Sequence, residues 1–199
     1  MSEDESSKGV IVLVVLSIVI VGVLGFILFG FSKNPPKTNT VEYNYYTFEE
    51  VGGLWQTTLV KGNLSYLAIF RFNPEQVEDV YILGSFKGFK KTPLYLTFDP
   101  NATTDEFKYL TLATTELSLH LVRGLGLKIE AACTVNETLA CADRPIVTCN
   151  SNESVIYLVP KAPTQMTLQG NCVVVSGKKF ELLKSVDRLL FQWYKVMKQ

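Results

Sequence analysis

The sequence predicts an α+β domain attached to one N-terminal transmembrane helix, and three observations lead to this fold class. An uncharged and mostly apolar run extends from Val10 to Phe31. After it, short β-rich segments alternate with two segments of helical periodicity. Four cysteines, an even number, all lie in this second part. We therefore expect a mixed β-sheet that is covered by two helices and cross-linked by disulfide bonds.

The apolar run is long enough to cross a bilayer, whose hydrocarbon core of about 30 Å needs roughly 20 apolar residues in a helix. A cleaved signal peptide has a basic start and an apolar stretch of only about 7–15 residues. Here the start is acidic, with Glu3, Asp4 and Glu5, and the run is longer. The sequence thus predicts an uncleaved anchor, with these segments: cytoplasmic tail 1–8, membrane helix 9–32 in the lipid bilayer, stalk 33–40, and domain 41–199.

The side of the membrane on which the domain lies follows from its cysteines and glycosylation signals. Lysines flank the apolar run almost evenly, so the positive-inside rule decides little. Disulfides persist in oxidising compartments, and N-glycosylation sequons are used in secreted loops. Four sequons occur after the anchor, headed by Asn63, Asn101, Asn136 and Asn152. We expect an extracytoplasmic domain and a cytoplasmic N-terminus.

A pilin-like alternative depends on the junction Lys8-Gly9. A glycine directly before a long apolar helix resembles the cleavage site of archaeal type IV pilins, in which the processed helix packs into a filament core. The leader here is acidic, and the helix lacks the early glutamate of many pilins. Processing after Gly9 therefore stays an alternative to the uncleaved anchor.

Length and charge limit the remaining function classes. The chain has 199 residues, and about 160 remain after the anchor, the size of one domain. The whole chain has 19 basic and 19 acidic residues, of which 18 and 16 follow the apolar run. This balance lacks the basic surface of nucleic-acid-binding proteins, so no nucleic-acid partner is expected.

The pattern of the domain predicts one strand–helix–strand unit and further strands. Residues 94–132 form this unit, and such crossovers join parallel strands with a right-handed connection. Residues 64–72 are apolar on both faces, which favours a central strand. The expected strands are 41–48, 54–60, 64–72, 80–83, 94–98, 127–132, 155–159, 165–168 and 172–175, and the expected helices are 110–124 and 180–197.

The cysteines have spacings typical of disulfides and not of a zinc site. Structural zinc sites pair cysteines two to four residues apart, and no such pair occurs among Cys133, Cys141, Cys149 and Cys172. Four cysteines allow three pairings. We favour Cys133–Cys141, which closes a local loop, together with Cys149–Cys172, which ties that loop to the last strand.

No catalytic, cofactor-binding or metal site is predicted. His120 is the only histidine, and no nucleophile stands at a spacing that it could activate, so a surface or partly buried role is expected. The pattern Asp99-x-Asn101-x-Thr103-x-Asp105 begins like a calcium loop, but the required glycine and glutamate are missing. A looser calcium site of Asp99, Asp105 and Glu106 is less favoured than a polar turn. We expect a non-enzymatic binding or envelope-structural protein with a protein partner in the envelope; a cell-surface hydrolase is the second alternative.

Three segments of the domain carry a resemblance to a known group of proteins. They are Phe70–Val80; Leu96–Pro100 with Thr115–Ser118; and Cys133–Cys149 with Asn171–Gly177 and Ser185–Leu190. Together they resemble uncharacterised single-pass membrane proteins of small-genome archaea of the DPANN type. The resemblance implies a membrane-anchored organisation and an extracytoplasmic location, and it implies no activity.

Overall fold

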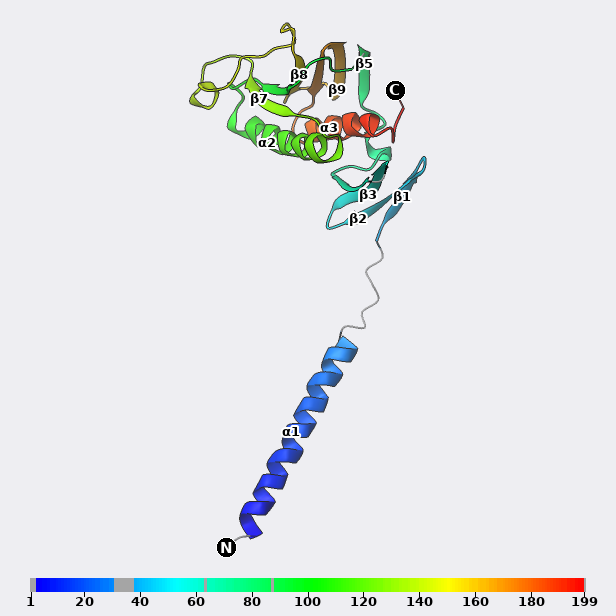
Figure 1. The fold of residues 1–199 in the computed structure, drawn as a ribbon, viewed down its shortest axis with the longest axis vertical. Coiled ribbons are helices and arrows are strands. Elements are labelled where there is room, and N and C mark those ends of the chain that lie inside the picture. The colour runs from blue at the N-terminus through cyan, green and yellow to red at the C-terminus, as the bar shows by residue number, and fades with distance from the viewer. Residues whose placement is uncertain (1–2, 31–37, 63, 87, 199) are drawn as a thin grey trace. The chain divides into compact units, whose positions relative to one another are not determined.

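A computed structural model describes residues 3–30, 38–62, 64–86 and 88–198. The chain forms two compact units, residues 1–37 and 38–199. The first contains helix α1, Glu3–Gly30, so residues expected in a tail continue the helix (Figure 1). Most of the expected stalk, residues 33–37, lies outside the described residues. Within the described part of the chain, no helix has both the length and the apolar content needed to cross a membrane.

The second unit contains two β-sheets. The smaller sheet is antiparallel, in the order β1-β2-β3-β4, and the larger is mixed, in the order β5-β9-β10-β8-β6-β7. The strands are β1 Thr40–Tyr43, β2 Tyr46–Val51, β3 Leu54–Lys61, β4 Leu64–Phe70, β5 Tyr81–Phe86, β6 Leu94–Phe98, β7 Ile129–Cys133, β8 Ser154–Val159, β9 Gln165–Gly170 and β10 Cys172–Ser176. The α+β class with a mixed sheet is confirmed.

The predicted strand–helix–strand unit is present as β6, helix α2 (Thr104–Leu119) and β7, and the two strands are parallel neighbours. The helix begins six residues earlier than expected. Thr103 accepts a hydrogen bond from the Glu106 backbone N–H, and the Glu106 carboxylate accepts one from the Thr103 backbone N–H. This capping box satisfies the free N–H groups of the first turn, which the apolar periodicity alone does not reveal. The helix ends in a π-helical turn, η2, His120–Gly124.

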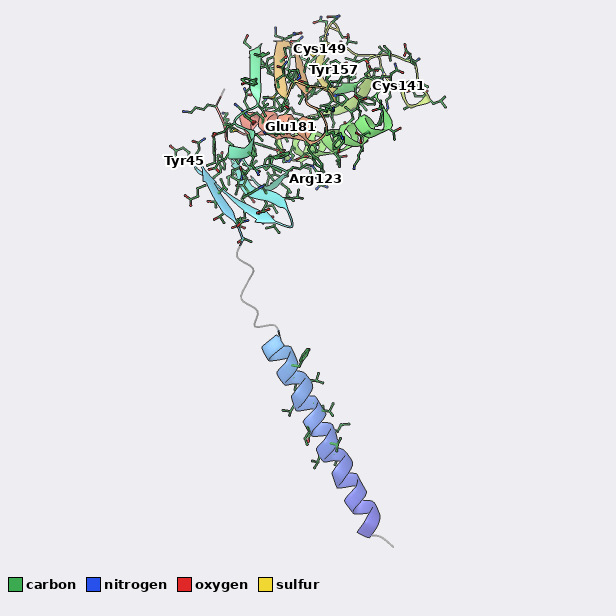
Figure 2. All side chains as sticks on the ribbon, turned by 180° about the vertical axis from the view of Figure 1, so that it is seen from behind. Tyr45, Arg123, Cys141, Cys149, Tyr157 and Glu181 are labelled. Carbon is green, nitrogen blue, oxygen red and sulfur yellow. A yellow bond between two sulfur atoms is a disulfide. The ribbon has the colours of Figure 1, made fainter. Side chains whose placement is uncertain are left out.

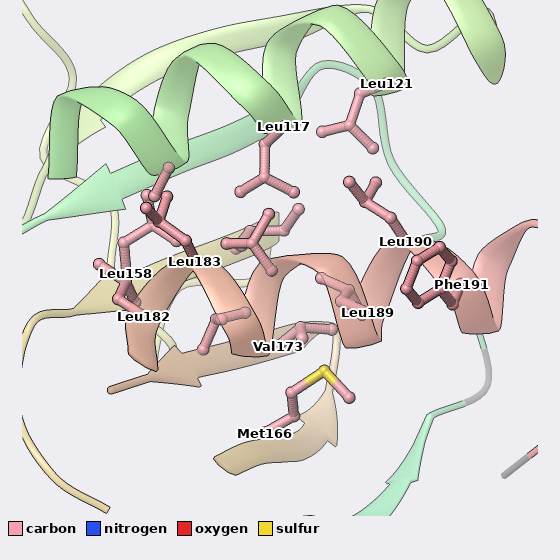
Figure 3. Packing of buried hydrophobic residues seen from close by; sticks show 14 of the residues in the cluster. Leu117, Leu121, Leu158, Met166, Val173, Leu182, Leu183, Leu189, Leu190 and Phe191 are labelled. Atoms are coloured by element: carbon pink, nitrogen blue, oxygen red, sulfur yellow. The ribbon is translucent and has the colours of Figure 1, made fainter. Parts of the chain in front are cut away.

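The core lies around helix α3, Phe180–Trp193. Leu183 and Leu190 of α3 pack toward Leu117 of α2 and Leu121 of η2, as Figure 3 shows. Strands β8, β9 and β10 contribute Leu158, Met166 and Val173 to the same cluster, in which these side chains are fully buried. The two helices therefore cover one face of the larger sheet, as the sequence predicts.

The smaller sheet packs its inner face against the C-terminal part of α3. The Phe70 ring centroid lies 4.5 Å from that of Phe191, and the Phe48 centroid lies 5.5 Å from it. The outer face stays open, with Leu67 54% and Ile69 45% exposed. The prediction that this strand is central is wrong, because β4 is an edge strand whose free edge contacts helices instead of a further strand.

The expected strand 41–48 is instead a hairpin of β1 and β2. Its two-residue turn begins at Asn44, which has a positive φ of 54°. Asparagine tolerates this left-handed conformation better than most residues. The turn is also anchored from outside, since Asn44 Nδ2 donates a hydrogen bond to the Val196 carbonyl at 2.6 Å. A contact with residue 196 cannot be foreseen from local sequence, which explains the error.

Both favoured disulfides are present. Cys133–Cys141 and Cys149–Cys172 have Cα–Cα separations of 6.0 and 5.2 Å. Cys149 and Cys172 lie with Ala132, Val147 and Val155 in a small second core on the sheet face opposite the helices. Cys133 and Cys141 belong to the main core. Short 3₁₀ turns occupy Glu75–Val77 (η1) and Leu139–Cys141 (η3).

Candidate functional site

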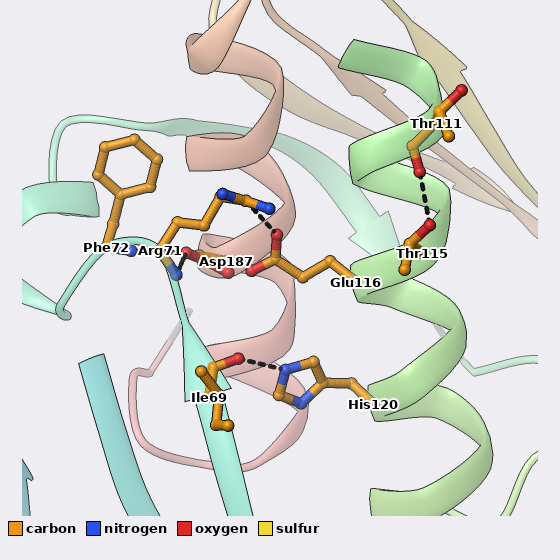
Figure 4. A network of polar contacts seen from close by, with 8 residues as sticks. All are labelled: Ile69, Arg71, Phe72, Thr111, Thr115, Glu116, His120 and Asp187. Atoms are coloured by element: carbon orange, nitrogen blue, oxygen red, sulfur yellow. Dashed lines mark hydrogen bonds and ion pairs between the residues drawn. The ribbon is translucent and has the colours of Figure 1, made fainter. Parts of the chain in front are cut away.

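A buried carboxylate joins the smaller sheet to the helices. The sequence places Asp187 on the polar side of α3, but its side chain is fully buried. Its Oδ2 atom accepts hydrogen bonds from the backbone N–H groups of Arg71, at 3.0 Å, and Phe72, at 2.8 Å (Figure 4). These N–H groups directly follow β4, so Asp187 fastens the end of that strand to α3.

A second carboxylate, Glu116 of α2, lies beside Asp187. It is 8% exposed, and its Oε2 atom forms an ion pair with Arg71 Nε at 3.0 Å. Burial raises the pKa of Asp187 well above its ordinary value, and the neighbouring Glu116 carboxyl raises it further. Burial also raises the pKa of Glu116, while its hydrogen bond with Asp187 and the nearby Arg71 lower it. Because Asp187 is the more deeply buried of the two carboxyls, we infer that it is the one that holds the proton.

The single histidine belongs to the same junction. His120 is 2% exposed, with Nε2 2.9 Å from the Ile69 carbonyl and Nδ1 3.1 Å from the Tyr194 hydroxyl. Because the carbonyl only accepts, Nε2 carries the proton of the neutral ring. Burial lowers the pKa of His120, and its ring stacks on Phe70 at 4.7 Å. The expected surface or partly buried role is therefore wrong: the imidazole is fully enclosed and bonded on both nitrogens.

These groups form a structural joint, which we define as Arg71, Glu116, His120 and Asp187. Each connects β4 or the residue after it to α2, η2 or α3. The acidic groups are too enclosed to meet a substrate, and buried carboxyls need partners of this kind to avoid a large desolvation cost. The arrangement fixes the angle between the smaller sheet and the helices.

We expect the joint to make stability depend on pH. Two carboxyls with raised pKa values bind more protons in the folded than in the unfolded chain. Their contribution to stability is therefore present at acidic pH and declines as pH rises from about 4 through their folded pKa values. His120 acts in the opposite sense, because its lowered pKa makes the folded state gain stability as pH rises from that lowered value to about 6.5.

The variant Asp187→Asn separates the titration of the carboxyl pair from that of His120. Its amide oxygen can still accept hydrogen bonds from the Arg71 and Phe72 backbone N–H groups, but the amide does not titrate. Urea unfolding of both proteins, followed by the fluorescence of Trp55 and Trp193, gives the free energy of unfolding at each pH. We expect the wild type to lose stability relative to Asp187→Asn as pH rises. Parallel pH curves for the two proteins would contradict an ionisable pair at this position.

The acidic residues near the start of α2 are occupied by local contacts. Glu106 caps the helix, Asp99 Oδ1 accepts a hydrogen bond from the Asn101 backbone N–H, and Asp105 lies 3.7 Å from Lys179 Nζ. His120 stands fourteen positions beyond Glu106, about 21 Å along the helix. Among the described residues, no three His, Cys, Asp or Glu side chains form a group that could hold a metal ion. The structure thus does not bring the histidine and these acids into one site.

Three of the four sequon asparagines, Asn101, Asn136 and Asn152, are exposed in loops; the fourth, Asn63, lies outside the described residues. Asn101 follows β6 and Asn136 follows the neighbouring parallel strand β7, so both lie at the same end of the larger sheet. The Asn101 amide donates a hydrogen bond to Glu137, the residue after Asn136. Asn152 precedes β8 and lies at the other end.

The outer face of the smaller sheet contains a notch of about 370 Å³. Its lining comes from β2, β3, β4 and the turn between β1 and β2. Tyr45 lies in that turn and is 99% exposed (Figure 2). The lining residues are Tyr45, Tyr46, Thr47, Glu49, Gln56, Thr57, Thr58 and Leu67. The sequence pattern does not predict this hollow, because residues 41–48 have the composition of one continuous strand.

Comparisons of the chain with protein-family models, with curated proteins and with solved structures find no match.

Proposed function

We propose that this chain is a single-pass membrane protein whose disulfide-bonded domain lies outside the cytoplasm and serves binding or envelope structure. The observation that carries the proposal is the apolar surface of α1. Its described apolar side chains, from Leu13 to Phe26, are each at least 50% exposed, on every side of the helix. A helix that is apolar all round requires an apolar environment, which a bilayer supplies.

The domain supports the same location. Two disulfides stabilise proteins in oxidising compartments, and the exposed Asn101, Asn136 and Asn152 are accessible as glycan acceptors. Binding is favoured over hydrolysis because the buried carboxyls and His120 are engaged in the joint, whereas the notch presents polar groups at the surface.

Protease accessibility tests the proposed topology. In intact cells that express the full chain, we expect added protease to degrade the domain, and alkaline extraction to leave the chain in the membrane pellet. A variant that lacks residues 1–37 is the control and should leave the pellet. Cleavage only after permeabilisation would place the domain in the cytoplasm and contradict the proposal.

Intact-mass measurement of the native protein separates the anchor from the pilin-like alternative. Residues 1–9 remain on an uncleaved anchor. A mature N-terminus at Val10, together with filaments, would instead establish processing after Gly9.

A further inference from the structure

The notch forms where β2 separates from β3. These strands pair beside their Gly52–Gly53 turn, and the last pair is Glu49 with Gln56. The same register would place Thr47 opposite Thr58, but the pairing stops before them. Beyond this point β3 continues its ladder with β4 alone, and β2 continues with β1 alone.

Contacts at the far end of the hairpin account for this separation. Asn44 donates to the Val196 carbonyl at 2.6 Å, and the Phe48 ring packs edge-on against Phe191. Both partners belong to α3 or the segment after it. The hairpin tip is therefore held by the helix end, while β3 follows β4, and the space between β2 and β3 stays open.

Backbone hydrogen-bonding groups face into this space from both sides. In an antiparallel ladder, every second residue directs its N–H and C=O toward the same neighbour. Glu49 is directed toward β3, so Thr47 is too; Gln56 is directed toward β2, so Thr58 is too. The register thus gives the notch two backbone donors and two backbone acceptors that have no strand partner across it. Side-chain hydroxyls of the lining threonines and the Gln56 amide add both kinds of group.

The charge of the lining selects against anions. Among the described residues that line the notch, Glu49 carries the only side chain that is charged at neutral pH, and none is a lysine, arginine or histidine. A phosphate or sulfate would meet repulsion and no compensating cation. A neutral polyhydroxyl compound matches better, since each hydroxyl both donates and accepts, and the exposed Tyr45 ring offers an apolar surface at the rim. The volume, about 370 Å³, lies near the lower end of small-molecule pockets, about 300–1,000 Å³.

We propose that the notch between β2 and β3 binds a neutral sugar ring. Hydroxyl groups of the sugar bond to Thr47, Gln56 and Thr58, and Glu49 accepts a hydrogen bond from one of them. The inference rests on the binding role proposed above and gives it a site and a ligand class.

Saturation-transfer NMR tests this site with the full chain, held in a detergent that has no sugar headgroup. The probes are the methyl glycosides of glucose, mannose and galactose, N-acetylglucosamine, and methyl phosphate, an anion whose methyl protons can be observed. We expect transfer to at least one sugar and none to methyl phosphate. Gln56→Ala should weaken sugar binding about 2- to 10-fold, the effect of one lost hydrogen bond. The control Glu42→Gln changes a carboxylate on the same sheet face but outside the notch and should bind like the wild type.

A linear trisaccharide of the sugar that binds shows whether the notch takes a single terminal sugar or a longer glycan chain. Equal affinity for monosaccharide and trisaccharide supports a site for a terminal ring, and tighter trisaccharide binding supports a site for a glycan chain. Absence of transfer to all four sugars, or equal binding by Gln56→Ala and Glu42→Gln, would overturn the proposal. Neither result would bear on the proposed membrane topology, because protease accessibility tests that topology separately.

Discussion

Replacement of Phe70 by alanine is expected to lower the free energy of unfolding by about 3–5 kcal/mol, the usual cost of truncating a buried phenylalanine. Phe70 is fully buried, and its ring contacts Phe48, Phe191 and His120. The substitution removes the side chain on which the smaller sheet, α3 and η2 meet. Because small domains have a total stability of about 5–15 kcal/mol, this loss is a large share of the total.

The neighbouring Ile69→Ala is the matched control for Phe70→Ala. Its side chain belongs to the same strand but points to the outer face, where it is 45% exposed. We expect a change below about 1 kcal/mol in urea unfolding. Equal effects of the two substitutions would show that the inner face of β4 does not support the core as described.

Replacement of Asp187 by alanine is expected to cost about 2–5 kcal/mol. The backbone N–H groups of Arg71 and Phe72 would lose their acceptor in a buried place, at about 1–3 kcal/mol each. Glu116 would also lose its partner carboxyl. The measurement is again urea unfolding, here at neutral pH.

Asp79→Ala controls for the loss of a carboxylate that contacts α3. Asp79 forms an ion pair with Lys184 at 2.8 Å, but its own side chain is 72% exposed. Exposed ion pairs contribute about 0–1 kcal/mol, so this variant should stay close to the wild type. If Asp187→Ala were equally mild, the joint would not hold the smaller sheet to the helices.

The features predicted correctly have their cause in nearby residues. The strand β6 was predicted with its observed bounds, because Leu94–Phe98 alternates and ends at Asp99-Pro100. The disulfide pairs followed from loop closure, and α3 followed from its apolar periodicity. Each of these patterns is complete within one segment of the sequence.

The features that were missed depend on distant contacts. A helix on the surface of a domain buries one face, so the polar side of α3, with Asp187 and Arg188, is expected to face solvent. Instead α3 lies between the two sheets and buries both of its faces. Arg188 lies 7% exposed and donates to the Lys198 carbonyl. The hairpin turn at Asn44 and the notch beside it likewise depend on the segment after α3. No pattern within residues 41–60 contains that information.

The position of α3 in the chain constrains the order of events during synthesis. Residues 180–193 follow all ten strands, and both sheets bury their inner faces against this helix. The contact between Arg71 and Asp187 spans 116 positions, so it cannot form while the ribosome is still adding the intervening residues. A chain arrested before residue 180 would expose two apolar sheet faces, and such surfaces are prone to aggregate. Productive folding of this domain therefore calls for a chaperone, or for a delay, until its last helix has emerged.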